Sequence, residues 1–113
     1  MSIYSLNLGH LNANDHQTFH TVYTVPVAQG PAVVRSISIQ ANPGTQVIVR
    51  VVFPDTVACL IGYVDNATGT QRVVENIITY QPLAPGTTIE AENNFTADGP
   101  YTVIVGGYQF AQP

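Results

Sequence analysis

Hydrophobic and polar residues alternate along two stretches of this 113-residue chain. In residues 32–39, one face would carry Val33, Ile37 and Ile39, while two serines fall on the other. In residues 88–92, an isoleucine and an alanine alternate with two glutamates. A period of two is typical of strands that are buried on one side only. Both stretches are therefore predicted to be half-buried β-strands.

A third stretch, residues 46–53, is apolar on both faces. Its odd-numbered positions are three valines and a phenylalanine, and on the other face Ile48 and Val52 flank Arg50. Such a strand is either central in a two-layer core or covered on its outer side by a partner. The sequence leaves both alternatives open.

The whole chain is predicted to be an antiparallel β-sandwich. No stretch has helical periodicity, β-branched residues are abundant, and Gly and Pro recur at short intervals, which is typical of all-β sandwiches and barrels. We expect a single domain, residues 1–113, of jelly-roll type with seven or eight strands. Residues 22–110 would form the sandwich core and residues 1–21 an N-terminal arm or edge strand. The predicted strands are 3–8, 18–25, 32–40, 46–53, 57–64, 72–80, 87–92 and 101–110.

Two connections are also predicted. Residues 9–17 are mostly polar and are expected to form a loop. The Asn-Pro-Gly sequence at 42–44 is a strong turn signal, and we expect it to join its two neighbouring strands as a hairpin.

Charged residues are scarce in this sequence, and this limits the classes of partner that the protein can be expected to bind. The chain has no lysine, three arginines and seven acidic residues, so charged residues make up 9% of it against about 25% in a typical soluble domain. The buried centres of protein interfaces are depleted in charge, so this composition favours assembly with other subunits. Three scattered arginines offer no basic surface for phosphates, and we expect no nucleic-acid partner.

The candidate chemistry is weak. His10, His16 and His20 are close in sequence, but in a strand the last two would lie about 13 Å apart, too far to share a metal ion. No motif of nucleophilic, phosphate-binding or paired-carboxylate catalysis is present. We therefore expect no enzyme activity, no metal, no cofactor and no small-molecule substrate. Cys59 lies in an apolar run and is predicted to be a buried, inert thiol.

The N-terminus does not resemble a signal peptide, and no apolar run approaches the ~20 residues of a membrane-spanning helix. We expect a chain made in the host cytoplasm, with no membrane partner.

Several stretches resemble a known group of proteins. They are Tyr-Thr-Val-Pro at 23–26, the strands that follow it, Leu-Ala-Pro-Gly-Thr at 83–87, and a final strand that ends in Gly-Tyr at 107–108. This pattern resembles the small β-sandwich structural proteins of tailed bacteriophages, which include capsid decoration (cement) proteins and tail or fibre components. The resemblance covers roughly residues 22–108, and its motifs are strand and turn signals that shape a sheet.

The resemblance implies a virion structural protein, most specifically a decoration protein on the outer capsid surface. Its partners would be the major capsid protein and copies of itself, with a trimer suited to a three-fold lattice site. The alternatives are a tail, neck or fibre-associated protein, or a carbohydrate-binding, lectin-like module that uses exposed tyrosines beside Asn and Asp. The residues that we predict to contact protein partners are Tyr4, Leu6, Leu8, Phe19, Ile48, Arg50 and Val52.

Overall fold

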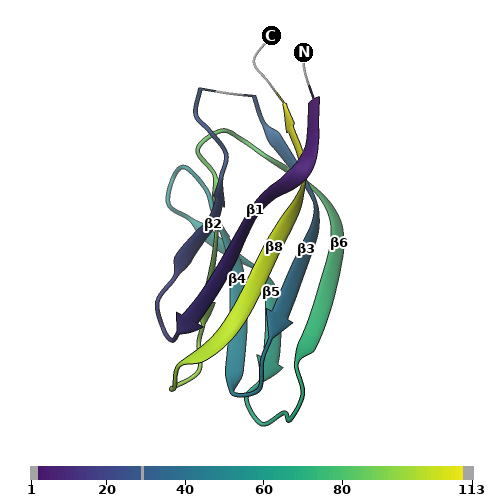
Figure 1. Cartoon of the computed structure of the whole chain (residues 1–113). Helices are drawn as coiled ribbons and strands as arrows, with labels where there is room; N and C mark the ends of the chain where they lie inside the picture. The colour runs from purple at the N-terminus through teal and green to yellow at the C-terminus, as the bar shows by residue number, and fades with distance from the viewer. Residues whose placement is uncertain (1–2, 29, 111–113) are drawn as a thin grey trace.

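The computed structural model describes residues 3–28 and 30–110, and for residues 3–6 it describes the backbone only. Eight strands form two four-stranded sheets, and every strand pair is antiparallel (Figure 1). The predicted antiparallel sandwich is therefore confirmed. The strands are β1 (Ile3–Asp15), β2 (His20–Thr24), β3 (Ala32–Ala41), β4 (Thr45–Val52), β5 (Ala58–Asn66), β6 (Val73–Leu83), β7 (Thr88–Asn93) and β8 (Gly99–Phe110).

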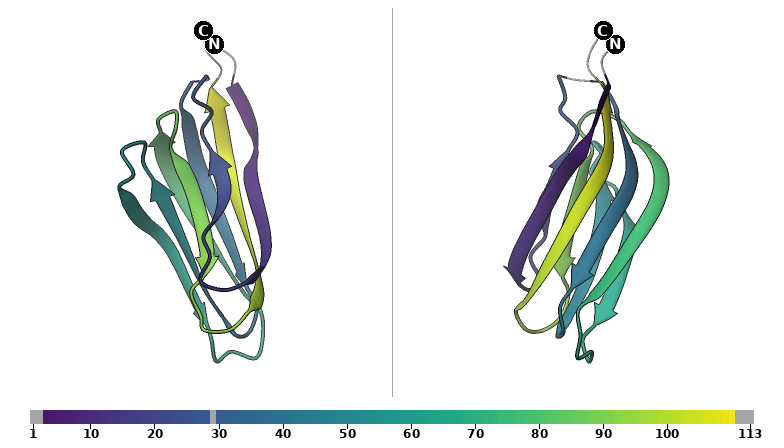
Figure 2. Two further views of the ribbon diagram at one scale, coloured as in Figure 1. Left: turned by 90° about the vertical axis from the view of Figure 1, so that its left-hand side faces the viewer. Right: turned by 45° about the vertical axis from the view of Figure 1, so that its right-hand side comes forward.

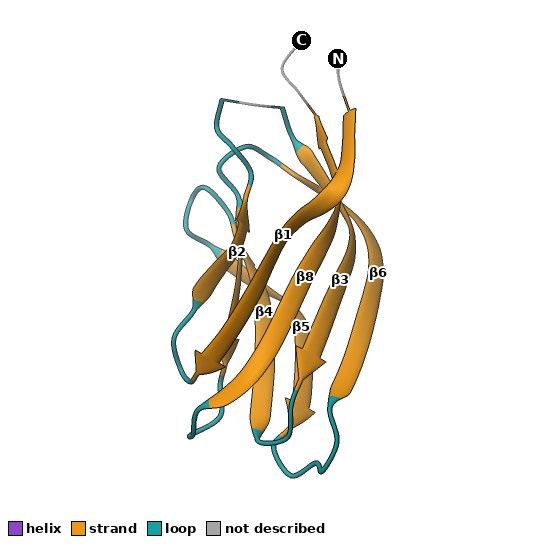
Figure 3. Cartoon of the chain, viewed as in Figure 1, coloured by secondary structure: helices purple, strands orange, loops and turns teal. Residues whose placement is uncertain are grey.

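The two sheets lie face to face as layers (Figure 2). Sheet A has the order β1-β8-β3-β6 and sheet B the order β2-β7-β4-β5. The chain crosses between the sheets at every connection except β4 to β5, and the loops gather at the two ends of the sandwich (Figure 3). The strand pairs nest as 1·8, 2·7, 3·6 and 4·5. Among the described residues, no helix is long and apolar enough to cross a bilayer.

The core comes from alternate positions of the central strands. In β4, Val47, Val49 and Val51 share one face, as predicted, and this face points into the core, while Gln46, Ile48, Arg50 and Val52 are half-buried on the outer face. Phe53, which the pattern places on the same face as the valines, lies beyond the end of β4 and is exposed. The other fully buried apolar side chains include Ile39, Leu83, Ile89, Tyr101, Val103 and Val105. Removal of this apolar surface from water is the main term that stabilises the fold.

A β-bulge changes the alternation in β3. The register shifts between Val34 and Ser36, so Arg35 is an extra residue relative to β8, whereas on the other side β6 has one more residue than β3 at this point. As a result Val34 and Ile37, rather than Val33 and Ile37, belong to the central core cluster. A bulge moves one residue out of phase, and a simple period-two pattern does not reveal it.

The predicted loop at 9–17 is wrong over most of its length. β1 continues to Asp15 and pairs with β8 throughout, with a bulge at Gly9. Leu11 and Ala13 pack against the core, while Asn12 and Asn14 are exposed. This alternation is typical of an edge strand, but the many polar residues concealed it.

The predicted hairpin at 42–44 is also wrong. The turn is present, but β3 belongs to sheet A and β4 to sheet B. The same turn sequence can thus reverse the chain within one sheet or carry it to the opposite sheet. The choice depends on which faces of the flanking strands must meet in the core, and this is a tertiary property.

Candidate interaction surfaces

One flank of the sandwich, formed by β1 and β2, is closed. A Cβ atom at Gly9 would collide with the carbonyl oxygen of Val22, so the absence of a side chain lets β1 approach β2 closely. The Tyr23 hydroxyl donates to Gln109 Oε1, and Gln109 Nε2 donates to the Gly30 carbonyl at 2.8 Å. Burial raises the pKa of Tyr23, so its phenol stays protonated as this donor. Polar groups therefore seal this flank across both sheets.

The opposite flank, formed by β5 and β6, is open; we call these two strands the open flank. Each is an edge strand that pairs with one neighbour only. Of the nine large hydrophobic side chains exposed among the described residues, six lie on β5 and β6 and two more on the turn that leads into β5. Ile78 is 78% exposed, Tyr80 67% and Leu60 61%. Concentrations of exposed apolar side chains of this kind mark interaction sites.

An apolar cleft of about 170 Å³ opens between the two sheets at this flank. Most of its lining residues are aliphatic, and Thr79 and Gln81 add the polar groups. Gly62 lies next to this cleft, and its lack of a side chain leaves room for the ends of Ile77 and Ile39; a Cβ there would lie 2.9–3.0 Å from their Cδ1 atoms. The remaining lining residues are Val34, Ile37, Val51, Ile61, Ile77, Leu83 and Ile89.

The outer face of sheet A next to the open flank carries a cation between two aromatic rings. The Arg35 guanidinium carbon lies 5.4 Å from the ring centre of Tyr80 and 5.7 Å from that of Tyr108. Arg35 also donates to the Tyr108 hydroxyl at 3.2 Å. The bulge at Arg35 turns this side chain outward, where it fixes Tyr80 against the sheet.

The outer face of sheet B carries a second charged cluster. Arg50 donates to Glu90 Oε1 from Nε at 2.9 Å and from Nη2 at 2.7 Å, and its guanidinium carbon lies 3.5 Å from the ring centre of Phe19. Glu92 is almost completely buried beside them. Desolvation raises the pKa of Glu92, and the nearby Arg50 charge opposes that shift. The Arg50 guanidinium thus binds Glu90, lies near Glu92 and is covered by the ring of Phe19.

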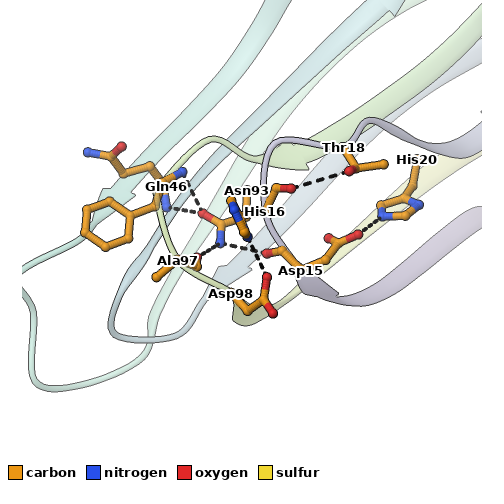
Figure 4. A network of polar contacts seen from close by, with 9 residues as sticks. Asp15, His16, Thr18, His20, Gln46, Asn93, Ala97 and Asp98 are labelled. Carbon is orange, nitrogen blue, oxygen red and sulfur yellow. Dashed lines mark hydrogen bonds and ion pairs between the residues drawn. The ribbon is translucent and has the colours of Figure 1, made fainter.

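A polar network holds one end of the sandwich together, with Asn93 at its centre (Figure 4). Asn93 Oδ1 accepts from the backbone N–H groups of Gln46 at 3.0 Å and Phe95 at 3.1 Å. Its amide Nδ2 donates to the carbonyls of Asp15 at 2.9 Å and Ala97 at 3.1 Å. A single fully buried side chain therefore satisfies backbone groups from the end of β1, the start of β4 and the connection between β7 and β8.

Two histidines lie at the rim of this network. His16 Nδ1 is 2.5 Å from Asp98 Oδ1, and His20 Nε2 is 2.7 Å from Asp15 Oδ2. Behind them, burial raises the pKa of Tyr101, and the carboxylates of Asp15 and Glu92 add to this effect. The Tyr101 phenol is therefore neutral. The pairs tie the 15–20 and 94–98 segments to the strands, which is a structural task.

The structure brings together four of the seven predicted contact residues. Ile48, Arg50 and Val52 share the outer face of β4, and Phe19 covers Arg50. Leu8 is half-buried and packs against the core instead of facing outward. The side chains of Tyr4 and Leu6 lie outside the described residues.

The prediction for Cys59 is wrong, because its thiol is exposed. It belongs to an apolar run, but β5 is an edge strand with a neighbour on one side only. Sequence reasoning also missed the open flank as a site. The sequence carries only a weak signal, the apolar runs 57–61 and 77–80 in consecutive strands, because such runs do not tell whether a strand is central or at an edge.

Comparison with known proteins identifies the fold. No protein-family model matches the chain, and no curated protein matches it by sequence. Among solved structures, a subunit of the Bacillus endospore appendages, described as disulfide-linked pili, is similar with 11% identity and a TM-score of 0.50, covering 99% of this chain and 88% of the other. The Drosophila NLP core, studied for pentamer formation and histone binding, has 16% identity and a TM-score of 0.51, covering 96% and 98%.

A viral protein has a comparable similarity. A chain of infectious bursal disease virus, Gt strain, shares 10% identity and a TM-score of 0.51 over 96% of this chain, which spans about a third (32%) of the viral chain. At these identities the likeness concerns the fold. The molecule is therefore an eight-stranded β-sandwich similar to domains found in a pilus, a histone-binding core and a virus.

Proposed function

We propose that this chain is a structural subunit of a virion, and most specifically a capsid decoration protein. It would bind the outer surface of a phage head, with the major capsid protein and copies of itself as partners. The three structural neighbours support this class, since two come from a pilus and a virus and the third from a study of pentamer formation. The proposal goes beyond their fold similarity and depends on the surfaces described above.

The open flank is the observation that carries the proposal. Its strands, β5 and β6, contain only two charged residues, Asp65 and Glu75. Six large apolar side chains are exposed on them. A flank that is apolar, poor in charge and bordered by two unpaired strand edges loses little on desolvation and gains much on contact with protein.

The outer face of sheet B provides a second contact surface. Ile48 and Val52 are half-buried there, next to the exposed Leu60 and Tyr63 of β5. A subunit that contacts neighbours through a flank and a face can bridge them. A decoration protein of this kind stabilises the shell by linkage, because it binds the assembled state and not the separate subunits.

The carbohydrate-binding alternative has weaker support. Lectin sites place aromatic rings and polar groups around one concavity. Here Tyr63 and Tyr80 belong to different sheets, and the cleft between the sheets is mostly aliphatic. We therefore rank a virion contact surface above a sugar site, and a tail or neck location remains the nearer alternative.

The proposal is tested on purified particles. Virions from the source that encodes the chain are separated on a density gradient, and the bands are examined by mass spectrometry and by immunogold labelling with an antibody against the chain. We expect the chain in the particle band, with gold on the heads. Labelling of tails would support the alternative virion role. Absence from all particles, together with binding on a glycan array, would overturn the proposal.

A further inference from the structure

The open flank is suited to a second copy of the same chain. Resting on the proposed structural function, we propose that two copies join edge to edge through β5 and β6. The two-fold axis would lie normal to the sheets at the level of Gly62 and Ile77. In this arrangement β6 pairs with β6 of the partner and β5 with β5 of the partner, so both sheets continue across the interface.

The size of the flank suits a reversible pair. With the axis at Ile77, residues 73–81 of β6 lie beside their copy, which corresponds to about 30 Å at ~3.3 Å per residue. The smallest Cα extent of the molecule is 18 Å. The contact therefore covers roughly 530 Å² per copy, below the ~800 Å² per partner of a standard interface and in the size range of weaker, reversible contacts. Edge-to-edge pairing would also satisfy most of two rows of unpaired backbone groups, with interruptions where the register shifts at Ile61 in β5 and at residues 79–80 in β6.

Charge selects the orientation of the axis. Asp65 lies three residues from Gly62, and Glu75 lies two residues from Ile77. Both lie on the side of the connection 67–72, because that short connection joins the end of β5 to the start of β6. The two carboxylates therefore occupy the same end of the flank, at nearly the same level.

An axis parallel to the strands would place β6 beside β5 of the partner at the same level. Glu75 of each copy would then lie next to Asp65 of the other, and like charges that face each other across strands destabilise the pair. An axis normal to the sheets turns the second copy end over end, so that opposite ends of the two flanks lie side by side. It separates Glu75 from its copy by about 13 Å and Asp65 from its copy by about 20 Å along the strands. Both distances exceed the Debye length of ~8 Å at physiological salt.

The side chains of β6 also favour the axis that is normal to the sheets. Around Ile77, Val74 of one copy lies opposite Tyr80 of the other, a β-branched and aromatic pair that is favourable across strands. Residues 76–81 carry no charge and no proline. Glu75 and Pro82, which bound this stretch, are the residue types that limit edge pairing. They restrict the contact to the central register and oppose open-ended growth of the sheet.

The two-fold pair differs from the trimer expected from lattice symmetry. It completes both sheets of each subunit at once, and a trimeric ring cannot do this through one flank. The closed flank remains free, since Gly9 and Val22 already bring β1 and β2 together.

The first test measures association of the purified chain by sedimentation velocity from micromolar to high micromolar concentration. We expect a reversible dimer. The variant Ile78→Lys places a charge in the centre of the interface and should raise the dimer Kd by about tenfold or more. Val27→Lys is the matched control, because Val27 is also 78% exposed but lies outside the open flank. Circular dichroism establishes that both variants are folded.

The second test fixes the orientation. Cys59 is the only cysteine of the chain and would lie about 20 Å from its copy, so a short bismaleimide should not join two wild-type chains. In the variant Ile78→Cys with Cys59→Ser, the two new thiols lie close together on one sheet, and the reagent should give a covalent dimer. The strand-parallel axis would place these thiols on opposite sheets and give no such product.

A monomer at all concentrations, a trimer, a dimer that Ile78→Lys leaves unchanged, or failure of the Ile78→Cys cross-link would each overturn the inference. These outcomes are separable from failure of the proposed function. A chain that is monomeric in solution but present on purified heads would retain its virion role, with a capsid protein on the open flank. A dimer that is absent from particles would retain the interface and lose the role.

Discussion

The two flanks of this sandwich are both formed by edge strands, but one flank is closed and the other is open. Both β1 with β2 and β5 with β6 are pairs of edge strands, one from each sheet. On the first flank a glycine meets a backbone carbonyl, and the strands come together. On the second flank a glycine faces only the ends of flexible side chains, and a cleft remains. The two glycines therefore differ in what lies nearest to them, a backbone carbonyl on the closed flank and the ends of isoleucine side chains at the open flank.

The difference extends to the surface of the flanks. Among the described side chains of β1, the exposed ones are Asn7, His10, Asn12 and Asn14, whereas those of β5 and β6 include Leu60, Ile78 and Tyr80. Polar edges remain in contact with water, while apolar edges with free backbone groups attract another strand. The comparison therefore separates a flank that completes the monomer from one that connects monomers in the proposed dimer.

The largest expected effect tests whether the inner wall of the open flank is true core. Ile37 lines the cleft but is only 2% exposed. Ile37→Ala should lower the free energy of unfolding by about 2–5 kcal/mol, measured by urea denaturation. A loss below about 1 kcal/mol would mean that water already reaches this wall and that the open flank extends deeper than the cleft.

The next effect compares the two glycines directly. Gly9→Ala should cost about 1–3 kcal/mol, because the added methyl group meets a backbone carbonyl that cannot move without its strand. Gly62→Ala should change the stability by no more than about 1 kcal/mol, since Ile77 can shift into the cleft and alanine is favoured over glycine in a strand. Both are measured by thermal and urea unfolding. Equal losses at the two sites would contradict the distinction between the flanks.

A smaller effect on stability is expected on the outer face of sheet B, which lies between the two flanks. Arg50→Ala removes the contacts with Glu90 and Phe19. The side chains of Arg50 and Glu90 are 33% and 23% exposed, so solvent screens the pair and we expect a loss of about 1 kcal/mol. Gln46→Ala on the same face of β4 is the control and should have less effect. A loss as large as that of Ile37→Ala would make this face part of the core.

The smallest effect is a pH dependence from Glu92. Its pKa is raised in the folded state, so on raising the pH the unfolded chain ionises first, near the ordinary value of 4.5. Stability from this group is therefore lost as the pH rises through that value toward the folded pKa, and it stays lost above it. Glu92→Gln should be more stable than the wild type at pH 7, and the gain should shrink below pH ~4. A gain that is independent of pH would assign the effect to packing.

Features that follow from a local residue pattern could be predicted from this sequence, whereas features that depend on tertiary context could not. The inward valines of β4 and the outward position of Arg50 follow from the period of two. The continuation of β1 to Asp15 was hidden because its inward residues are only Leu11 and Ala13. The bulge at Arg35 and the crossing at 42–44 depend on partner strands. The exposure of Cys59 was not predictable, because an apolar run does not say whether its strand is central or at an edge.

The candidate surfaces follow the same division. Ile48, Arg50 and Val52 were found from sequence because a single strand shows both of its faces in its own alternation. The open flank needs two strands from different sheets to meet at one side, and the sequence does not contain that order explicitly. The sequence places Leu8 on a contact surface as part of the predicted N-terminal arm, whereas it is the extra residue of a bulge between Asn7 and Gly9 and packs against the core.

The pairing of β1 with β8 places Ile3 directly opposite Phe110. Any peptide or fluorescent domain fused beyond either residue would therefore emerge from the same pole of the molecule, next to the other terminus. A short peptide that links the two positions would also allow new ends to be cut elsewhere, for instance in the turn at 53–57. A fused peptide or domain at this pole would thus lie apart from the strands that are proposed to bind a second copy, so the two could be varied independently.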